Sequence, residues 1–172
     1  SIEVTKELLA NIPKIRLIKD QIKDIEIRYK LRKDLATQVI KLGIDFDYFT
    51  KKYSTLESIF IAQILIETPK EIKKRYGLDI DTNSIERPLR KLNNGEITKE
   101  AVFEILVELA KGKKPNYNKY KPLSEEEIIS YIKQIINKNK GASINALMGQ
   151  VMSKYRGKID GKTTIKLLKK YS

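Results

Sequence analysis

Residues 143–162, SINALMGQVMSKYRGKIDGK, read as a helix, a glycine-rich turn and the start of a second helix. The apolar residues of the first part recur at the three- and four-residue spacing of one helix face. They are Ile144, Leu147, Met148, Val151, Met152 and Tyr155. This pattern predicts a helix over residues 143–155 whose apolar stripe, both methionines included, packs into a protein core.

The opposite face of the same helix is predicted to carry a row of small residues. They are Ala142, Ala146, Gly149 and Ser153. A glycine inside a helix costs about 1 kcal/mol relative to alanine. We expect that cost to be offset by the close approach of another protein element or of a ligand backbone, and the sequence leaves both alternatives open.

Two glycines and an aspartate separate this helix from the next one. Gly157 is predicted to end the first helix with a positive φ angle, and Asp160 is predicted to cap the second. Gly161 is expected to leave the first backbone N–H groups of the second helix uncovered. Such a helix N-terminus beside cations is a typical anion site.

Cations surround this turn, and Asp160 is the one acid in residues 138–172. In the last helix, Lys162 and Lys166 are predicted to share a face with Lys169, opposite Ile165 and Leu168. We predict an RNA-binding set in which glycines allow close approach and cations hold phosphates. Its members are Gly149, Ser153, Lys154, Arg156, Gly157, Lys158, Gly161, Lys162 and Lys166. The alternative is a turn with solvated lysines.

The net charge of +13 is concentrated near the end of the chain. Residues 1–112 hold 21 basic and 18 acidic side chains, and residues 113–137 hold five and three. Residues 138–172 hold nine basic side chains and one acid. This distribution indicates a polyanionic partner for the C-terminal segment.

Helical periodicity extends over almost the whole chain, which predicts an all-α fold. Start signals include the capping boxes Thr68–Glu71 and Ser124–Glu127 and a cap at Thr98. The predicted helices cover residues 5–11, 14–28, 31–42, 45–52, 55–66, 69–75, 83–93, 98–110, 124–138, 143–155 and 161–170. Residues 59–66 are interpreted as a buried helix rather than a strand.

The segment KKPNYNKYKP, residues 113–122, has two prolines and no apolar period, which is typical of a linker. We predict a helical domain over residues 1–112, a linker over 113–122 and a small, basic, three-helix tail domain over 123–172. Tyr117 and Tyr120 are candidates for stacking on bases. A solvated hinge is the favoured interpretation.

Two similar segments, KLGIDFD at 41–47 and RYGLDID at 75–81, each end in a pair of aspartates, Asp45/Asp47 and Asp79/Asp81. Their 34-residue separation matches a tetratricopeptide repeat, but the tryptophan-glycine-tyrosine signature of that repeat is missing. Magnesium ligands are the other alternative for these aspartates. Helix capping after a glycine stop is the favoured interpretation.

The composition argues against several kinds of site. With no cysteine and no histidine, the chain has no disulfide, no thiolate or imidazole metal site and no histidine general base. It has no apolar run of about 18 residues and no signal-peptide pattern, so we expect a soluble, cytoplasmic protein without a membrane partner. Because the first residue is Ser1, we also expect it to be a piece of a longer chain.

Residues 145–152, NALMGQVM, and residues 156–162, RGKIDGK, resemble the tail of the B and E subunits of tRNA-dependent amidotransferases. The Asp-Gly form resembles the archaeal E subunit more than the B subunit. The resemblance is strong over residues 141–168 and weaker over 30–138. It identifies the chain as similar to the C-terminal helical and tail domains, of GatB/YqeY type, of this family.

The resemblance implies an ATP-dependent conversion of Glu-tRNA(Gln) into Gln-tRNA(Gln), with ammonia from a glutaminase/asparaginase-like partner subunit. ATP and Mg belong to a catalytic cradle that lies N-terminal to these domains in the family. This chain is then expected to bind the body of tRNA(Gln), to be non-catalytic alone and to need no cofactor itself. We assign no catalytic residue and no metal ligand.

Two other classes of function remain open from the sequence. The nearly charge-balanced helical part suits a protein-interaction module whose basic tail only aids solubility. A freestanding enzyme is disfavoured by the lack of histidine, cysteine and a phosphate loop.

Overall fold

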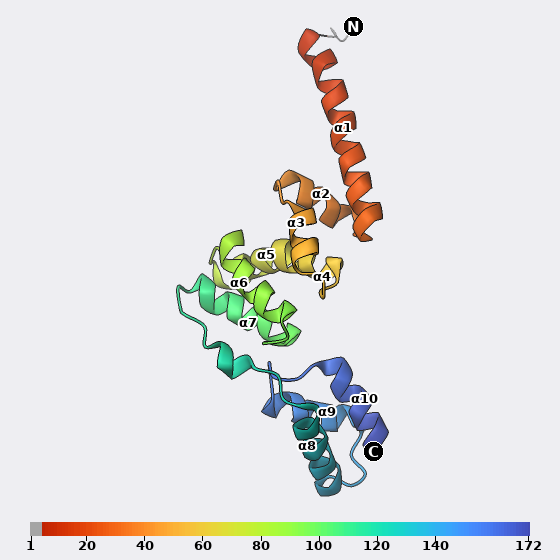
Figure 1. The fold of residues 1–172 in the computed structure, drawn as a ribbon, viewed down its shortest axis with the longest axis vertical. Coiled ribbons are helices and arrows are strands. Elements are labelled where there is room, and N and C mark those ends of the chain that lie inside the picture. Colours follow the sequence, from red (N-terminus) through yellow and green to blue (C-terminus); the bar gives the residue numbers. More distant parts are fainter. Residues whose placement is uncertain (1–4) are drawn as a thin grey trace. The chain divides into compact units, whose positions relative to one another are not determined.

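The computed structural model describes residues 5–172, apart from the side chain of Ala10, and every regular element in that range is a helix. The all-α prediction is therefore confirmed. Figure 1 shows the helices in chain order. The chain divides after Arg75 into two compact units. None of the described helices combines the length and the apolar composition that crossing a membrane requires.

The first unit consists of short helices that follow one long helix. They are α1 (Lys6–Tyr29), α2 (Lys33–Lys41), α3 (Phe46–Lys52), α4 (Ser58–Ala62), the π-helix η1 (Gln63–Glu67) and α5 (Thr68–Tyr76). The C-terminal half of α1 joins the core through Ile25, which is buried, and through Tyr29, whose ring meets that of Phe46 edge to face at 4.9 Å. Asp45 caps α3 by accepting a hydrogen bond from the backbone N–H of Tyr48, so its capping role is confirmed.

The predicted break between residues 11 and 14 is wrong, because α1 continues through Pro13. Proline has no N–H to donate to the carbonyl four residues earlier, here that of Leu9. The described side chains of this half of α1 are exposed, so water can satisfy the carbonyl that loses its partner. Solvent therefore permits a proline that a buried helix would not tolerate.

The capping box predicted at Thr68 is also wrong. Thr68 has helical backbone angles, and its N–H donates to the carbonyl of Gln63, five residues earlier. The wider turn of η1 makes room for the ring of Pro69, which clashes with the preceding turn in a regular α-helix. The helices α4, η1 and α5 therefore follow one another without a break over residues 58–76. The interpretation of residues 59–66 as a buried helix is confirmed by the burial of Ile61, Ile64 and their neighbours.

The second unit contains the pair α6 (Thr82–Asn93) and α7 (Lys99–Ala110), the short 3-10 helix η2 (Tyr117–Tyr120), and the tail helices α8 (Glu125–Lys138), α9 (Ile144–Lys154) and α10 (Gly161–Tyr171). Asp81 caps α6 through the N–H of Ser84, at 2.7 Å, so capping is confirmed here too. Helices α6 and α7 pack through fully buried side chains that include Leu89 and Ile105.

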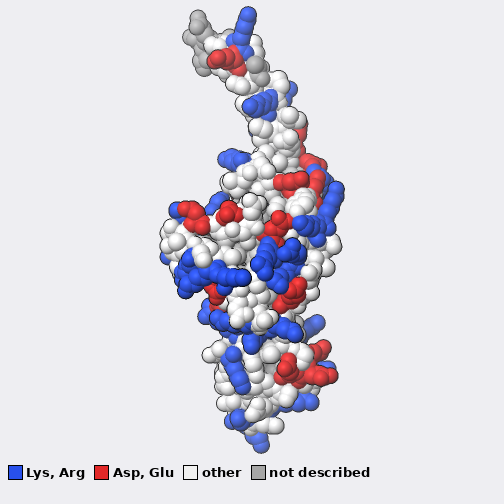
Figure 2. Space-filling model, turned by 60° about the vertical axis from the view of Figure 1, so that its left-hand side comes forward, with Lys and Arg blue, Asp and Glu red and all other residues white. Residues whose placement is uncertain are grey.

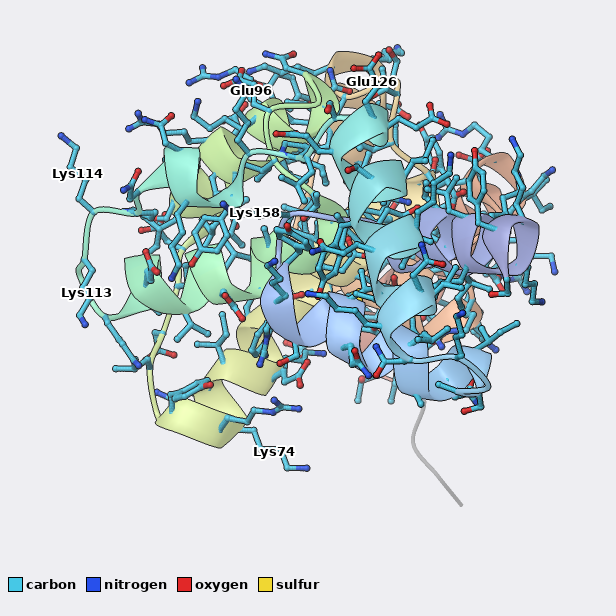
Figure 3. The ribbon with its side chains drawn as sticks, turned by 90° about the horizontal axis from the view of Figure 1, so that it is seen from below. Lys74, Glu96, Lys113, Lys114, Glu126 and Lys158 are labelled. Carbon is cyan, nitrogen blue, oxygen red and sulfur yellow. The ribbon has the colours of Figure 1, made fainter. Side chains whose placement is uncertain are left out.

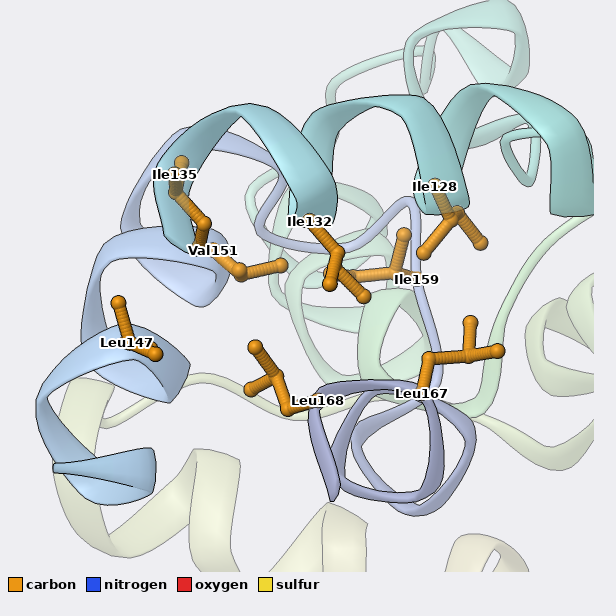
Figure 4. Packing of buried hydrophobic residues seen from close by; sticks show 8 residues of the cluster. All are labelled: Ile128, Ile132, Ile135, Leu147, Val151, Ile159, Leu167 and Leu168. Atoms are coloured by element: carbon orange, nitrogen blue, oxygen red, sulfur yellow. The ribbon is translucent and has the colours of Figure 1, made fainter. Parts of the chain in front are cut away.

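The three tail helices pack around one small core within the second unit (Figure 4). Its side chains come from all three helices and from the segment before α10. They are Ile128, Ile132, Ile135, Leu147, Val151, Ile159, Leu167 and Leu168. The capping box is confirmed, since Ser124 and Glu127 exchange hydrogen bonds at 2.9 and 3.2 Å. The apolar stripe of α9 faces this core as predicted.

The segment between α7 and α8 is less solvated than the hinge interpretation suggested. Tyr120 is 1% exposed, and its hydroxyl donates to a carboxylate oxygen of Glu108 at 2.9 Å. Burial, together with this hydrogen bond, raises the pKa of Tyr120. A solvated or base-stacking role is therefore wrong for Tyr120, which anchors the segment to α7.

Gly157 lies within the turn after α9, in close contact with Tyr120. Its φ is +76°, as predicted, and a Cβ atom there would lie 3.1 Å from the ring of Tyr120. Gly141, in the turn before α9, has a similar φ of +84° but nothing within 4 Å of the same position. Both glycines therefore have a positive φ, but of the two only Gly157 also lacks room for a Cβ atom.

We expect Gly157→Ala to destabilise the second unit more than Gly141→Ala. Both substitutions force an L-residue into the left-handed region, at a cost of about 1–2 kcal/mol. The clash with Tyr120 should add about 1–3 kcal/mol for Gly157→Ala alone. Denaturant unfolding of the two variants beside the parent chain measures the difference, and equal losses would show that the Tyr120 contact is unimportant.

The linker predicted at residues 113–122 generates a second expectation. Lys113 and Lys114 are exposed, whereas Pro115 and Tyr120 are buried. A protease should therefore cut first near residues 112–114 and spare residues 117–120. Mass spectrometry of early fragments identifies the site, and early cleavage within η2 would contradict the anchoring of Tyr120.

Candidate nucleic-acid interface

The exposed face of α9 carries most of the predicted small-residue row. Ala146, Gly149 and Ser153 are exposed, but Ala142 packs against the tail core and does not belong to the row. A Cβ atom added to Gly149 would meet no atom within 4 Å. No described part of the chain covers this face, so no described element offsets the cost of Gly149 by packing against it.

Lys154 stands at the C-terminal end of α9 over two tyrosine rings. Its Nζ lies 4.3 Å from the ring centroid of Tyr131 and 5.2 Å from that of Tyr155. The two rings are packed edge to face at 4.9 Å. Cation–π attraction holds the ammonium group near this aromatic pair while the lysine remains exposed.

The turn after α9 is attached to α7. The carbonyl of Gly157 accepts a hydrogen bond from the hydroxyl of Thr98 at 2.7 Å, and Gly157 is buried. The Arg156 Nε lies 2.8 Å from a carboxylate oxygen of Glu104. Gly157 is therefore corrected from a contact residue to a packing residue, and Arg156 already has an acidic partner.

The anion site expected at the start of α10 is occupied by the protein's own carboxylates. The N–H of Gly161 donates to Glu100 at 3.1 Å, and the N–H of Thr163 donates to Asp160 at 3.1 Å. Burial acts to raise the pKa of Asp160, but hydrogen bonds from Thr163 and Lys162 outweigh it and the pKa is lowered. The expectation of uncovered N–H groups at Gly161 is therefore wrong.

A row of acids on α7 accounts for the findings at Gly161, Arg156 and Tyr120. Glu100, Glu104 and Glu108 are spaced four residues apart, so they share one face of the helix. They contact Gly161, Arg156 and Tyr120 respectively. This row was not predicted from the sequence, from which Asp160 alone was expected to oppose the cations. The spacing was a detectable signal, although the partners lie up to 61 residues away along the chain.

The remaining cations of the predicted set are on the tail surface. Lys162 and Lys166 are exposed on α10, whereas Lys158 is half-buried and its carbonyl accepts the N–H of Leu123 at 3.0 Å. Of the two residues predicted opposite these lysines, Leu168 is fully buried and Ile165 is 40% exposed, and Leu167 joins Leu168 in the core. On the face drawn in Figure 2, acidic side chains gather at one edge of the tail and cations are spread over the rest.

The structure therefore keeps one part of the predicted set at the surface and removes another. Six members are exposed: Gly149, Ser153 and Lys154 on α9, Arg156 in the turn that follows, and Lys162 and Lys166 on α10, whereas Gly157 is buried. Helix α10 begins beside Met148, because a Cβ atom at Gly161 would lie 3.6 Å from the Met148 methyl group. The described residues contain no group of three or more acidic side chains that could hold a metal ion.

Comparison with known proteins identifies the family. The GatB domain family matches residues 45–171. The chain is 36% identical over 99% of its length to the E subunit of the glutamyl-tRNA(Gln) amidotransferase of Sulfurisphaera tokodaii. It is 33% identical over 98% of its length to the corresponding E subunit of Methanocaldococcus jannaschii.

The chain spans only 28% and 29% of the lengths of these two relatives. No solved structure matches it. The family match covers most of the described chain, including α3 to α10 with the turn at Gly157. The chain belongs to the GatB domain family.

Proposed function

We propose that this chain is the tRNA-binding C-terminal part of a subunit of a glutamyl-tRNA(Gln) amidotransferase. The whole enzyme would convert Glu-tRNA(Gln) into Gln-tRNA(Gln) in the cytoplasm, using ATP, Mg and ammonia from a glutaminase/asparaginase-like partner subunit. ATP and Mg would bind in the part of the subunit that lies outside this chain. The part described here would hold the tRNA and would be inactive by itself.

The observation that carries this proposal is the exposure of the small residues and lysines of α9 and α10. Gly149 leaves an open surface where nothing from the described chain approaches, and Lys154, Lys162 and Lys166 are exposed on the same two helices. A folded RNA presents a phosphate backbone and shape rather than readable base edges. A surface of small residues bordered by lysines suits such contacts, because the backbone can come close and each phosphate can meet a cation.

A protein-docking role is favoured by a different observation in the first unit. Leu8, Leu9, Ile15 and Leu17 of α1 are 52–59% exposed. Exposed apolar side chains of this kind mark protein contacts. This second candidate function concerns another surface of the chain and predicts no dependence of RNA affinity on the tail lysines.

We expect the triple variant Lys154→Gln/Lys162→Gln/Lys166→Gln to bind a tRNA(Gln) transcript more weakly. Each lost phosphate contact should make the slope of log K against log salt shallower by about 1. The slope should therefore change by about 2–3, measured by fluorescence anisotropy at several salt concentrations.

The matched control for this test removes three exposed lysines from α1, as Lys14→Gln/Lys19→Gln/Lys23→Gln. It changes the net charge equally and should leave the slope close to that of the parent chain. If both triple variants lose affinity equally, the effect is one of net charge, and the tail site is refuted.

Gly149→Leu tests the small-residue face without changing any charge. Nothing lies within 4 Å of the Cβ position, so the side chain should fit and the folded state should gain up to about 1 kcal/mol from better helix propensity. The bulk should nevertheless keep an RNA backbone away and weaken binding. A thermal melt and a tRNA titration of the same sample measure both effects, and unchanged affinity would remove this face from the site.

A further inference from the structure

A second cationic surface lies in the other half of the second unit. A hollow of about 390 Å³ is formed by the first turn of α6, the end of α7 and the loop that follows α7. Its polar walls are made by Asn83 and Ser84 from α6, Arg87 one turn further on, and Tyr117 from η2. Lys113 and Lys114 border it from the loop.

The charge of this hollow distinguishes it from comparable ones. Arg87, Lys113 and Lys114 give it three positive charges, and its described lining contains no carboxylate. Four other hollows of about 400–500 Å³ each include at least one aspartate or glutamate in their lining. Two carboxylates near its lining already have partners: Asp81 accepts the N–H of Ser84, and Glu108, whose charge acts on Tyr117, accepts the hydroxyl of Tyr120.

Tyr117 supports the cations of this surface. The guanidinium carbon of Arg87 lies 5.2 Å from the centroid of its ring, and the Nζ of Lys91 lies 4.9 Å from the same centroid. Lys91 also forms an ion pair with Glu96 at 2.5 Å, so its charge is offset. Burial raises the pKa of Tyr117, with Arg87 and Arg90 acting in the opposite direction, so the phenol stays neutral and does not cancel the charge of Arg87.

Lys113 and Lys114 complete the surface with flexible side chains. Figure 3 shows both extending from the loop after α7, away from the helices, and both are exposed. A lysine ammonium on its flexible four-carbon stem can turn toward an anion that arrives from solvent. The planar guanidinium of Arg87 supplies the complementary element, a rigid pair of donors for two oxygens of one phosphate.

We propose that this hollow binds a phosphate group, held by Arg87 and closed over by Lys113 and Lys114. The molecule that carries this phosphate is assigned from the proposed function. It is the backbone of the bound tRNA, for which the hollow is a second contact besides the lysines of α9 and α10. Two of the three cations project into solvent, which suits a phosphate on the surface of a large RNA. A small free metabolite usually needs an enclosed pocket instead.

The test uses the triple variant Arg87→Gln/Lys113→Gln/Lys114→Gln of the full 172-residue chain. Its matched control removes one arginine and two lysines from α1, as Arg16→Gln/Lys14→Gln/Lys19→Gln. We expect the hollow variant to make the salt slope for tRNA(Gln) shallower by about 2–3, and the control to leave it unchanged. The double variant Lys113→Gln/Lys114→Gln, which keeps the Arg87–Tyr117 contact, should show about two-thirds of the effect with an unchanged melting temperature.

Inorganic phosphate is the second probe, because it separates the two possible sources. In the parent chain it should shift the backbone amide resonances of Ser84, Lys113 and Lys114, and these shifts should disappear in the hollow variant. Phosphate-dependent shifts with an unchanged tRNA slope would support a phosphate site and overturn RNA as its source. Absence of both effects would overturn the inference entirely.

The hollow variant and the tail variant test two different surfaces, so their outcomes can be told apart. A tail variant that loses affinity beside an unaffected hollow variant would retain the proposed function and refute this second contact. The reverse pattern would support the hollow as the RNA contact and refute the assignment to α9 and α10. Shallower slopes in both variants, adding when the two are combined, would support both surfaces.

Discussion

The attachment of the Gly157 turn to α7 is the contact on which the arrangement of the second unit depends. The Gly157 carbonyl accepts the Thr98 hydroxyl at 2.7 Å, and the absence of a side chain at Gly157 lets the ring of Tyr120 lie against the turn. Tyr120 in turn donates to Glu108 on α7. One glycine therefore joins α7, the segment before α8 and the tail in a single packed contact.

The acids of α7 make this contact electrostatically favourable as well as close-packed. Glu100 satisfies the Gly161 N–H at the start of α10, and Glu104 pairs with Arg156. A helix N-terminus carries partial positive charge, so a carboxylate beside it is stabilising. The same groups that would attract an external anion are consequently used to hold the tail in place.

This use of charge changes how the strongly basic tail is interpreted. A count of nine cations and one acid in residues 138–172 suggested one continuous phosphate-binding surface around the turn. Glu100 and Glu104, which lie outside that range, contact Gly161 and Arg156 at its centre, while Lys154, Lys162 and Lys166 are exposed on α9 and α10. A further cationic surface is formed where Arg87 of α6 meets Lys113 and Lys114 of the loop after α7, residues that lie more than 20 positions apart in the chain.

The sequence by itself determined the helical class, the three tail helices, the core stripe of α9 and the caps at Asp45, Asp81, Ser124 and Asp160. These features depend on residues three or four positions apart, and such spacings can be read directly along a chain. The resemblance carried by residues 145–152 and 156–162 likewise identified the family from local motifs. Prolines were interpreted less well, because Pro13 and Pro69 are tolerated through solvent exposure and a π turn respectively.

Only the tertiary structure decided which of the predicted binding residues are available. Gly157 and Gly161 both lie in a local pattern typical of an anion site, but Tyr120 and Glu100 reach them from 37 and 61 residues away in the chain. Gly149 has no such partner and remains open. Local spacing fixes which groups a turn offers, whereas the long-range packing of α7 determines whether those groups bind the protein itself or are left for a ligand.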